Sequence, residues 1–341
     1  CLLQCGFYLH KIQFPVQRDE EGHVNIGFYA GRTHTVIDTD MCYIQAEVND
    51  EIIRVIRKYI EDYTISTYNE VEHKGLVRHV LTRVGFATGE LMVCLVVNGS
   101  ELSHSDKLIE ELTKIPGMTS ISININTDKT NRTLGDKCIT LWGQDYITDY
   151  IGDIMYQISP LSFYQVNPMQ TKVLYDKALE YVDLQGDEIV WDLYCGIGTI
   201  SLFLAKKAKM VYGVEIVERA IEDARHNAKI NHIDNVEFFV GKAEEVVEQE
   251  YEQDLAGKKA SVVVVDPPRK GCDESLLDTL MGMAPDRIVY VSCDPATLAR
   301  DIKILGEGKG GCRYKVEKVS VVDQFGHSGH VECVTLLQRI D

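Results

Sequence analysis

The sequence has no apolar run that approaches the roughly 18–20 residues of a membrane-spanning helix. It also lacks an excess of positive charge, because it has 35 lysines and arginines against 52 aspartates and glutamates, which gives a net charge of −17. This balance speaks against a protein that holds nucleic acid by a basic surface alone, although it permits a local basic groove. The ten cysteines lack close pairing, which favours a reducing, cytoplasmic location over a disulfide scaffold.

The first five residues lack the basic segment and apolar stretch of a signal peptide, and no initiator Met precedes them. We therefore expect a cut or processed end, with a segment missing upstream. The 341 residues are enough for two domains, since a domain has roughly 100–200 residues. With 45% hydrophobic and 26% charged residues, the composition is that of a globular protein and excludes disordered and fibrous classes.

Residues 1–155 have the pattern of an α+β domain. Two strand patterns flank the polar stretch at 18–23, which predicts a hairpin, and apolar residues then recur at helical spacing. The expected elements are strands at 12–16 and 25–30, a helix at 49–63, strands at 76–84 and 91–97, a helix at 103–114 and a strand at 119–125.

Residues 156–341 alternate strand and helix patterns, which is typical of a doubly wound α/β sheet. The expected helices are at 169–182, 199–207 and 218–231, and the expected strands are at 188–193, 210–214, 236–240, 261–265 and 288–292. Two final strands at 315–322 and 331–338 are joined by too few residues for a parallel crossover. They should therefore form an antiparallel pair.

A glycine-containing loop, Asp-Leu-Tyr-Cys-Gly-Ile-Gly at 192–198, follows the first strand of this second half. A third glycine would predict a nicotinamide dinucleotide site, but Ser201 stands there. Glu215 ends the next strand, where a carboxylate can accept from both ribose hydroxyls of a nucleoside. The combination favours an S-adenosylmethionine site, with other nucleotides or a purely structural turn as alternatives.

Two reactive side chains follow later strands of the same sheet. Asp266 begins an Asp-Pro-Pro-Arg-Lys-Gly loop, and Cys293 lies in Ser-Cys-Asp-Pro after the next strand. Both should lie at the carboxyl edge of the sheet, where ligands bind in open α/β folds. Position alone does not decide whether Cys293 is a nucleophile or an inert buried thiol.

Five segments of the second half occur in the order found in the RNA uracil-5-methyltransferase family, which this half of the chain resembles along almost its whole length. They are 163–167 (Phe-Tyr-Gln-Val-Asn), 192–198, 266–269 (Asp-Pro-Pro-Arg), 292–295 (Ser-Cys-Asp-Pro) and 330–332 (His-Val-Glu). Segments 11–16 and 27–34 are similar to the central domain of that family. The resemblance is strongest to the branch that acts on 23S ribosomal RNA.

The resemblance implies a Rossmann-like methyltransferase domain at 156–341, with the terminal antiparallel strand pair, behind an α+β central domain that contacts RNA. It implies that Cys293 is a nucleophile that adds to C6 of uracil, because C5 alone is too weak a nucleophile to accept a methyl group. It assigns Glu332 as the base that removes the C5 proton. The expected activity is S-adenosylmethionine-dependent methylation of uridine C5 in RNA, with 23S ribosomal RNA as the favoured substrate.

Further roles follow from the same resemblance. The expected substrate-binding residues are Phe163, Asp266 and Arg269, with Phe163 stacking on a flipped base. The residues expected to bind S-adenosylmethionine are Gln165, Tyr194, Gly196, Gly198, Thr199, Glu215 and Asp266.

The chain departs from the family in two respects. Many relatives carry an N-terminal β-barrel that binds RNA, and many hold an iron–sulfur cluster on three closely spaced cysteines and a distant fourth. Cys42 resembles the fourth ligand, but Cys1 and Cys5 have the wrong spacing for the others. We therefore expect no iron–sulfur cluster and no other metal in this chain, which is then a truncated or a compact member.

Three alternatives stay open at this point. The substrate could be transfer RNA, or the Asp266 loop could serve an amino methyltransferase that needs no cysteine. The chain could also be a non-catalytic RNA-binding factor on the same fold. The sequence does not show which uridine is modified, whether one or two are, or the oligomeric state.

Overall fold

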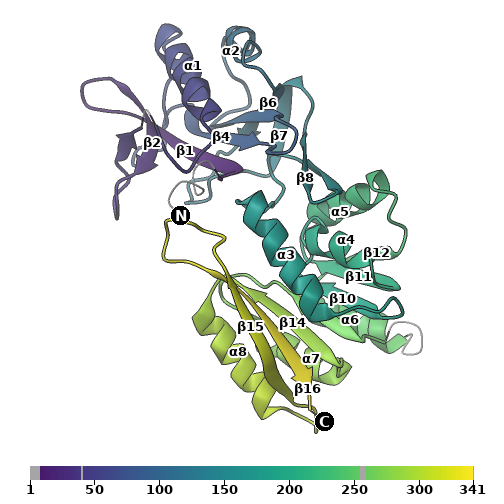
Figure 1. The fold of residues 1–341 in the computed structure, drawn as a ribbon. Helices are drawn as coiled ribbons and strands as arrows, with labels where there is room; N and C mark the ends of the chain where they lie inside the picture. Colours follow the sequence, from purple (N-terminus) through teal and green to yellow (C-terminus); the bar gives the residue numbers. More distant parts are fainter. Residues whose placement is uncertain (1–7, 40, 254–258, 341) are drawn as a thin grey trace. The chain divides into compact units, whose positions relative to one another are not determined.

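The computed structural model describes residues 8–39, 41–253 and 259–340. The chain forms two compact units (Figure 1). Unit 1 comprises residues up to Tyr150 together with Tyr156–Leu161, and unit 2 comprises Ile151–Met155 together with Ser162 onward. Within the described ranges, every helix is too short or too polar to cross a membrane.

Unit 1 is built on one seven-stranded sheet with the order β3-β2-β1-β4-β5-β6-β7. Its elements are β1 (Lys11–Arg18), β2 (Val24–Tyr29), β3 (Val36–Asp38), α1 (Val48–Asp62), β4 (Val77–Val84), β5 (Leu91–Val97), α2 (Ser105–Leu112), β6 (Met118–Ile125) and β7 (Lys137–Gly143). The predicted hairpin is confirmed as the antiparallel pair β1 and β2. The other predicted elements are confirmed within two residues at each end, whereas β3 and β7 were not predicted.

The core of unit 1 lies between its sheet and its helices. Figure 1 shows α1 and α2 on the same side of the sheet. Ile52 and Ile56 of α1 are fully buried and pack in one cluster with alternate strand residues such as Leu95 and Ile123. Burial of each such side chain stabilises the folded unit by about 1.5–3 kcal/mol. The apolar face of α1 and the apolar face of the sheet therefore stabilise one another by packing together.

A hairpin of β8 (Ile147–Ile151) and β9 (Ile154–Ile158) carries the chain between the units. Its turn belongs to unit 2, because the Met155 amide donates to Oδ1 of Asn231 (2.9 Å) and Nδ2 of Asn231 donates to the Met155 carbonyl (2.7 Å). Asp153 forms an ion pair with Lys206 of unit 2. Both strands were missing from the predicted elements.

Unit 2 is a doubly wound α/β sheet with the order β12-β11-β10-β13-β14-β16-β15. Its strands are β10 (Ile189–Leu193), β11 (Met210–Glu215), β12 (Val236–Val240), β13 (Val262–Val265), β14 (Arg287–Ser292), β15 (Tyr314–Val322) and β16 (Glu332–Arg339). Its helices are α3 (Pro168–Val182), α4 (Thr199–Ala205), α5 (Glu218–Ile230), α6 (Ala243–Gln253), α7 (Glu274–Met283) and α8 (Pro295–Glu307). The sequence predicted all of these strands but none of the helices α6, α7 and α8.

The predicted fold class of this unit is confirmed. Strands β10 to β14 pair in parallel, and β16 pairs antiparallel with both β14 and β15. Helices α6, α7 and α8 share one apolar cluster with the sheet, and α3, α4 and α5 cover the opposite face. Every residue of Val262–Val265 is buried, as expected of a parallel strand covered on both faces.

Candidate active site

Three predicted site residues meet at one edge of the sheet in unit 2. Asp266 follows β13 and Cys293 follows β14, so both stand at the carboxyl edge of the parallel strands. Because β16 runs the opposite way, its first residue, Glu332, lies at the same edge. The pairing of Ser292 with Cys333 places Cys293 beside Glu332 across the two strands.

Glu332 is a buried carboxyl group. It is 4% exposed, and no hydrogen bond reaches its Oε2 atom from the part of the chain that the structure describes. Burial, together with the negative charge of Asp266, raises the pKa of Glu332 to about 8, against an opposing effect of Arg269. The group therefore holds a proton more firmly than an ordinary glutamate, as expected of an acid or base that works near neutral pH.

The other two groups feel the same environment. Burial raises the pKa of Asp266 to about 6. Burial also raises the pKa of the half-buried Cys293 thiol, as do the charges of Glu332 and Asp266, whereas Arg269 lowers it. Cys293, Glu332 and Asp266 are thus one electrostatic cluster in which Arg269 is the compensating cation.

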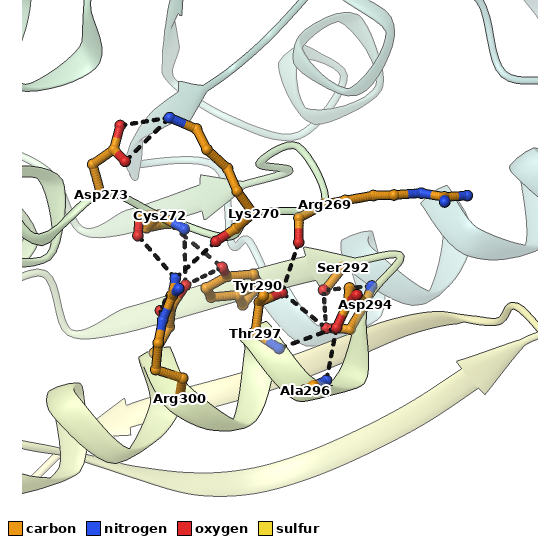
Figure 2. A network of polar contacts seen from close by, with 11 residues as sticks. Arg269, Lys270, Cys272, Asp273, Tyr290, Ser292, Asp294, Ala296, Thr297 and Arg300 are labelled. Atoms are coloured by element: carbon orange, nitrogen blue, oxygen red, sulfur yellow. Dashed lines mark hydrogen bonds and ion pairs between the residues drawn. The ribbon is translucent and has the colours of Figure 1, made fainter.

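A hydrogen-bond network fixes the two loops that carry this cluster (Figure 2). Oδ1 of Asp294 caps α8 by accepting from the amides of Ala296 (2.9 Å) and Thr297 (3.1 Å). The Thr297 hydroxyl donates to the Arg269 carbonyl (3.1 Å), which joins the Asp266 loop to the same helix. Figure 2 shows the Arg269 side chain extending away from this network, and its charge acts on Cys293 and Glu332.

The glycine loop after β10 has the tight backbone that its composition predicts. Gly196 and Gly198 have φ of 55° and 79°, a region that glycine adopts at little cost. The Gly196 amide donates to Oε2 of Glu215 (3.3 Å), and the Val217 amide donates to Oε1 (3.0 Å). The Glu215 carboxylate is therefore held against the loop, with lone pairs left to accept further hydrogen bonds.

Two other predicted cofactor residues belong to this loop or follow it directly. Tyr194 is half-buried and has a φ of 71°, which only a constrained loop imposes on a non-glycine residue. The Thr199 hydroxyl accepts a hydrogen bond from the buried Tyr175 hydroxyl (2.8 Å). The sequence analysis did not identify Tyr175 as a site residue. In the structure the negative charges of Asp266 and Glu332 both raise the pKa of its hydroxyl.

The segment 163–167 combines an exposed aromatic ring with buried polar groups. Phe163 is 69% exposed, whereas Gln165 and Asn167 are buried. Asn167 caps α3 by accepting from the Gln170 amide (3.2 Å). A ring with this exposure has its face available for stacking.

A buried clasp, formed by Asn167, Thr171 and Gln324, ties this segment to the loop that precedes Glu332. Nδ2 of Asn167 donates to the Gln324 carbonyl (3.3 Å), and Nε2 of Gln324 donates to the Thr171 hydroxyl (2.9 Å). All three side chains are at most 5% exposed. Nothing in the sequence predicted Gln324, whose partners are 153 and 157 residues away.

Residues 41–340 match the model of the tRNA (Uracil-5-)-methyltransferase family. The chain belongs to this family. It is accordingly an RNA methyltransferase, and the sequence-based resemblance is confirmed.

The chain is also similar to individual proteins, the last of which shares only the fold. The chain is 53% identical over 331 residues to an uncharacterized RNA methyltransferase of Clostridium tetani, covering 97% of this chain and 70% of the relative. It is 32% identical, with a TM-score of 0.81, to the Pyrococcus abyssi tRNA (uracil-54, C5)-methyltransferase in complex with S-adenosyl-L-homocysteine, over 98% and 76% of the two chains. A Streptococcus mutans protein assigned to the S-adenosylmethionine-dependent methyltransferases shares the fold, with a TM-score of 0.52 and 11% identity over 95% and 90% of the two chains.

The family match leaves the roles of single residues as predictions. The same holds for the roles assigned to residues 1–155 and 156–341 and for the expected absence of an iron–sulfur cluster. Cys1 and Cys5 lie outside the described residues, and Cys42 is half-buried. Within 8–39, 41–253 and 259–340, no group of three His, Cys, Asp or Glu side chains is placed to hold a metal ion.

Proposed function

We propose that this methyltransferase transfers a methyl group from S-adenosylmethionine to C5 of a uridine in RNA, with Cys293 as nucleophile and Glu332 as base. The observation that carries the proposal is the meeting of Cys293, Glu332 and Asp266 at one sheet edge. A thiol beside a carboxyl group of raised pKa supplies the two functions that an addition and elimination at uracil require.

The residues of unit 2 fit the proposed methyl donor. The Glu215 carboxylate stands at the end of β11, and the two residues that follow it, Ile216 and Val217, are apolar and more than half exposed. A hydrogen-bond acceptor next to apolar surface suits the ribose and base of a nucleoside. Gly196 and Gly198 keep side chains out of the neighbouring loop. When bound, S-adenosylmethionine supplies an electrophilic methyl group on a positively charged sulfur.

Cys293 activates the uracil ring by adding to C6. Its thiol must first give its proton to solvent, which reaches this half-buried side chain, because the thiolate is the nucleophile and burial favours the protonated form. Arg269 opposes that effect and also stabilises negative charge that passes to the ring. The new S–C6 bond moves the C5–C6 π electrons into an enolate, and C5 takes the methyl group as the bond between that group and the sulfonium sulfur breaks.

Glu332 completes the reaction by accepting the proton that C5 still carries after methylation. The electrons of the C5–H bond then form the C5–C6 double bond, and Cys293 leaves C6 as a thiolate. A carboxylate whose conjugate acid has a pKa of about 8 is a stronger base than an ordinary glutamate. Burial thus equips Glu332 for this step.

The proposed substrate is either a ribosomal or a transfer RNA. The motif segments favour 23S ribosomal RNA as the substrate. The similarity to the Pyrococcus abyssi enzyme, whose substrate is a transfer RNA, makes transfer RNA the second candidate. Both RNAs therefore belong in the first assay.

The decisive experiment uses radiolabelled S-adenosylmethionine and RNA in which 5-fluorouridine replaces uridine. Fluorine at C5 does not leave as a cation, so elimination stalls and a denaturation-resistant protein–RNA adduct accumulates. We expect the adduct with wild type and with Cys138→Ser, a control at another half-buried cysteine, but not with Cys293→Ser. Glu332→Gln should trap an adduct with ordinary uridine, since only the last step is blocked.

The outcomes separate the alternatives. Methyl transfer that survives Cys293→Ser would show an acceptor other than uracil C5, as in an amino methyltransferase. RNA binding without S-adenosylmethionine binding would indicate a non-catalytic factor. Absence of an adduct with both RNAs, when the methyl donor binds, would overturn the proposed mechanism.

A further inference from the structure

Helix α8 holds the loop that follows Asp266 against one of its faces. The helix begins two residues after Cys293, so it is joined directly to the proposed nucleophile. Three of its side chains contact the loop segment 269–272, namely Thr297, Arg300 and Asp301. Positions three and four residues apart share one face of a helix, so these side chains form a single contact surface.

Arg300 binds the backbone of this segment. Its Nη2 donates to the carbonyls of Lys270 (2.9 Å) and Cys272 (3.1 Å), and its Nε donates to Oδ1 of Asp301 (2.7 Å). The dashed lines that run from Arg300 to the loop in Figure 2 mark these bonds. The planar guanidinium thus has three acceptors in place, which fixes its orientation and that of the two peptide groups.

Asp301 joins the same segment to strand β14. Its Oδ2 accepts from the Cys272 amide (2.8 Å) and from the Tyr290 hydroxyl (2.6 Å). Both Asp301 and Tyr290 are fully buried. A buried carboxylate is costly even when it is paired, and an apolar residue would fill the space at lower cost. The geometry that Asp301 imposes on the loop, the strand and the helix is what this residue adds.

Gly271 allows the segment to approach α8 this closely. Its φ is 77°, and a Cβ at this position would lie 2.6 Å from both Nη2 of Arg300 and Oδ2 of Asp301. A side chain here would therefore push the loop away from the helix. Because the Thr297 hydroxyl also binds the Arg269 carbonyl, each residue from 269 to 272 is held in place by α8.

The held segment begins with Arg269, the cation of the site. Burial and the neighbouring carboxylates raise the pKa of Cys293 and of Glu332, whereas the Arg269 charge lowers both. The effect of a charge depends on its distance from the group on which it acts. Cys293 directly precedes the N-cap of α8 and the Arg269 carbonyl is bound to its first turn, so the helix sets the separation of the two backbones.

We propose that Arg300 and Asp301 are positioning residues for the nucleophile, which fix the Arg269 guanidinium relative to the Cys293 sulfur by holding the segment 269–272 against α8. In this position the guanidinium stabilises the thiolate and the negative charge that passes to the ring on addition. The proposal rests on the proposed function in one respect, namely that Cys293 is the nucleophile.

The test is the pH dependence of Cys293 alkylation in the free enzyme, which requires neither RNA nor S-adenosylmethionine. Iodoacetamide reacts with the thiolate, and mass spectrometry of the peptide that contains Cys293 follows this residue separately from the other cysteines. The charged groups that act on the thiol are Glu332, Asp266 and Arg269. Arg269→Gln should therefore move the midpoint of the profile to higher pH, by about 0.3–1 on the pH scale for the loss of one positive charge near a half-buried group.

Variants of the contact surface should reproduce this shift. Arg300→Gln removes both carbonyl contacts, and Gly271→Ala disturbs the same contact from the side of the loop, so each should raise the midpoint by a similar amount. In the Arg269→Gln background, Arg300→Gln should add no further shift, because it acts through Arg269. A residue that only stabilises the fold would not show this dependence on Arg269.

Arg339→Gln is the matched control and should leave the midpoint unchanged. Arg339 likewise combines an ion pair, with Asp286 (2.7 Å), and a backbone carbonyl contact, but it lies at the end of β16 opposite to Glu332. Thermal unfolding followed by circular dichroism shows whether each variant is folded at the temperature of the assay. If Arg300→Gln is not, Thr297→Val takes its place, since valine has the shape of threonine and lacks the hydroxyl that binds the loop.

An unchanged midpoint in Arg300→Gln, while Arg269→Gln moves it, would overturn the proposal. Shifts that add in the double variant would also overturn it, because Arg300 would then act by its own charge, and so would an unmoved midpoint in Arg269→Gln. If the shifts occur as expected and no 5-fluorouridine adduct forms, the proposed mechanism fails and the positioning role stands. If the adduct forms and the midpoint does not respond to Arg300, the positioning role fails and the mechanism stands.

Discussion

Replacing Glu332 with glutamine should stabilise the protein, and the gain should grow with pH. The pKa of the buried carboxyl rises from an ordinary 4.5 to about 8 in the folded protein, so the folded state binds the proton more tightly than the unfolded chain. Stability from this proton is fully present below pH 4.5 and is lost as the pH rises toward 8. Glutamine keeps the shape of the protonated acid and has no proton to lose.

The expected size follows from linkage. Each unit of pKa difference corresponds to about 1.4 kcal/mol, so the wild type should be less stable than Glu332→Gln by about 1 kcal/mol at pH 5 and about 4 kcal/mol at pH 8. The difference between the two pH values, about 3 kcal/mol, is the quantity to compare. It cancels effects of the substitution that do not depend on pH.

Urea unfolding measures this quantity, with the fluorescence of Trp191 as the signal. Trp191 is buried in unit 2, and Trp142→Phe removes the second tryptophan of the chain, which lies in unit 1. Glu237→Gln, at an exposed position on β12, is the control and should change stability little at either pH. A constant difference between wild type and Glu332→Gln at pH 5 and pH 8 would show that the Glu332 carboxylate is hydrated or paired, and the reasoning would fail.

Three further predictions concern the groups around this carboxyl. Gln324→Leu should slow release of the RNA adduct more than its formation, because the clasp positions the loop before Glu332 and not Cys293; single-turnover kinetics with ordinary uridine separate the two steps, and equal slowing would count against a positioning role. Arg269→Gln should move the pH dependence of adduct formation to higher pH, since the arginine charge lowers the pKa of Cys293; rates between pH 6 and 9 check this, and an unmoved profile would contradict it. Gly198→Ala should lower stability by about 1–3 kcal/mol, measured as a fall in Tm, because an L residue at φ 79° is strained and the added Cβ would lie 3.0 Å from a phenylalanine ring.

The sheet of unit 2 could be predicted because each of its strands has a recognisable local pattern of apolar and β-branched residues. Val262–Val265 is a run of β-branched residues, and the parallel arrangement then places whatever follows each strand at a common edge. That single rule locates Asp266, Cys293 and the glycine loop. Glu332 was assigned only through the family resemblance, because an antiparallel pair of terminal strands does not show which strand of the sheet it joins; the pairing of β16 with β14 is what places Glu332 at this edge.

Other features depend on contacts that local patterns do not contain. Strand β7 is an edge strand with mixed polar residues, so its alternation is weak, and it forms because β6 offers it a partner. The hydrogen bond from Asn167 to Gln324 joins residues that are 157 positions apart in the sequence. No local spacing pattern indicates that the loop containing Gln324 will lie beside Asn167.

The path of the chain between the units bears on how the protein can be dissected and synthesised. Residues Ile151–Met155 of the hairpin belong to unit 2, whereas the residues that follow them, Tyr156–Leu161, belong to unit 1. A cut at any single peptide bond between 150 and 162 would therefore leave at least one fragment without a segment of its own fold. Asp153 pairs with Lys206 and Met155 with Asn231. During translation the turn of the hairpin can therefore form these contacts only after more than fifty further residues have been synthesised. Separate expression of the halves is best attempted with overlapping ends that both include residues 151–161.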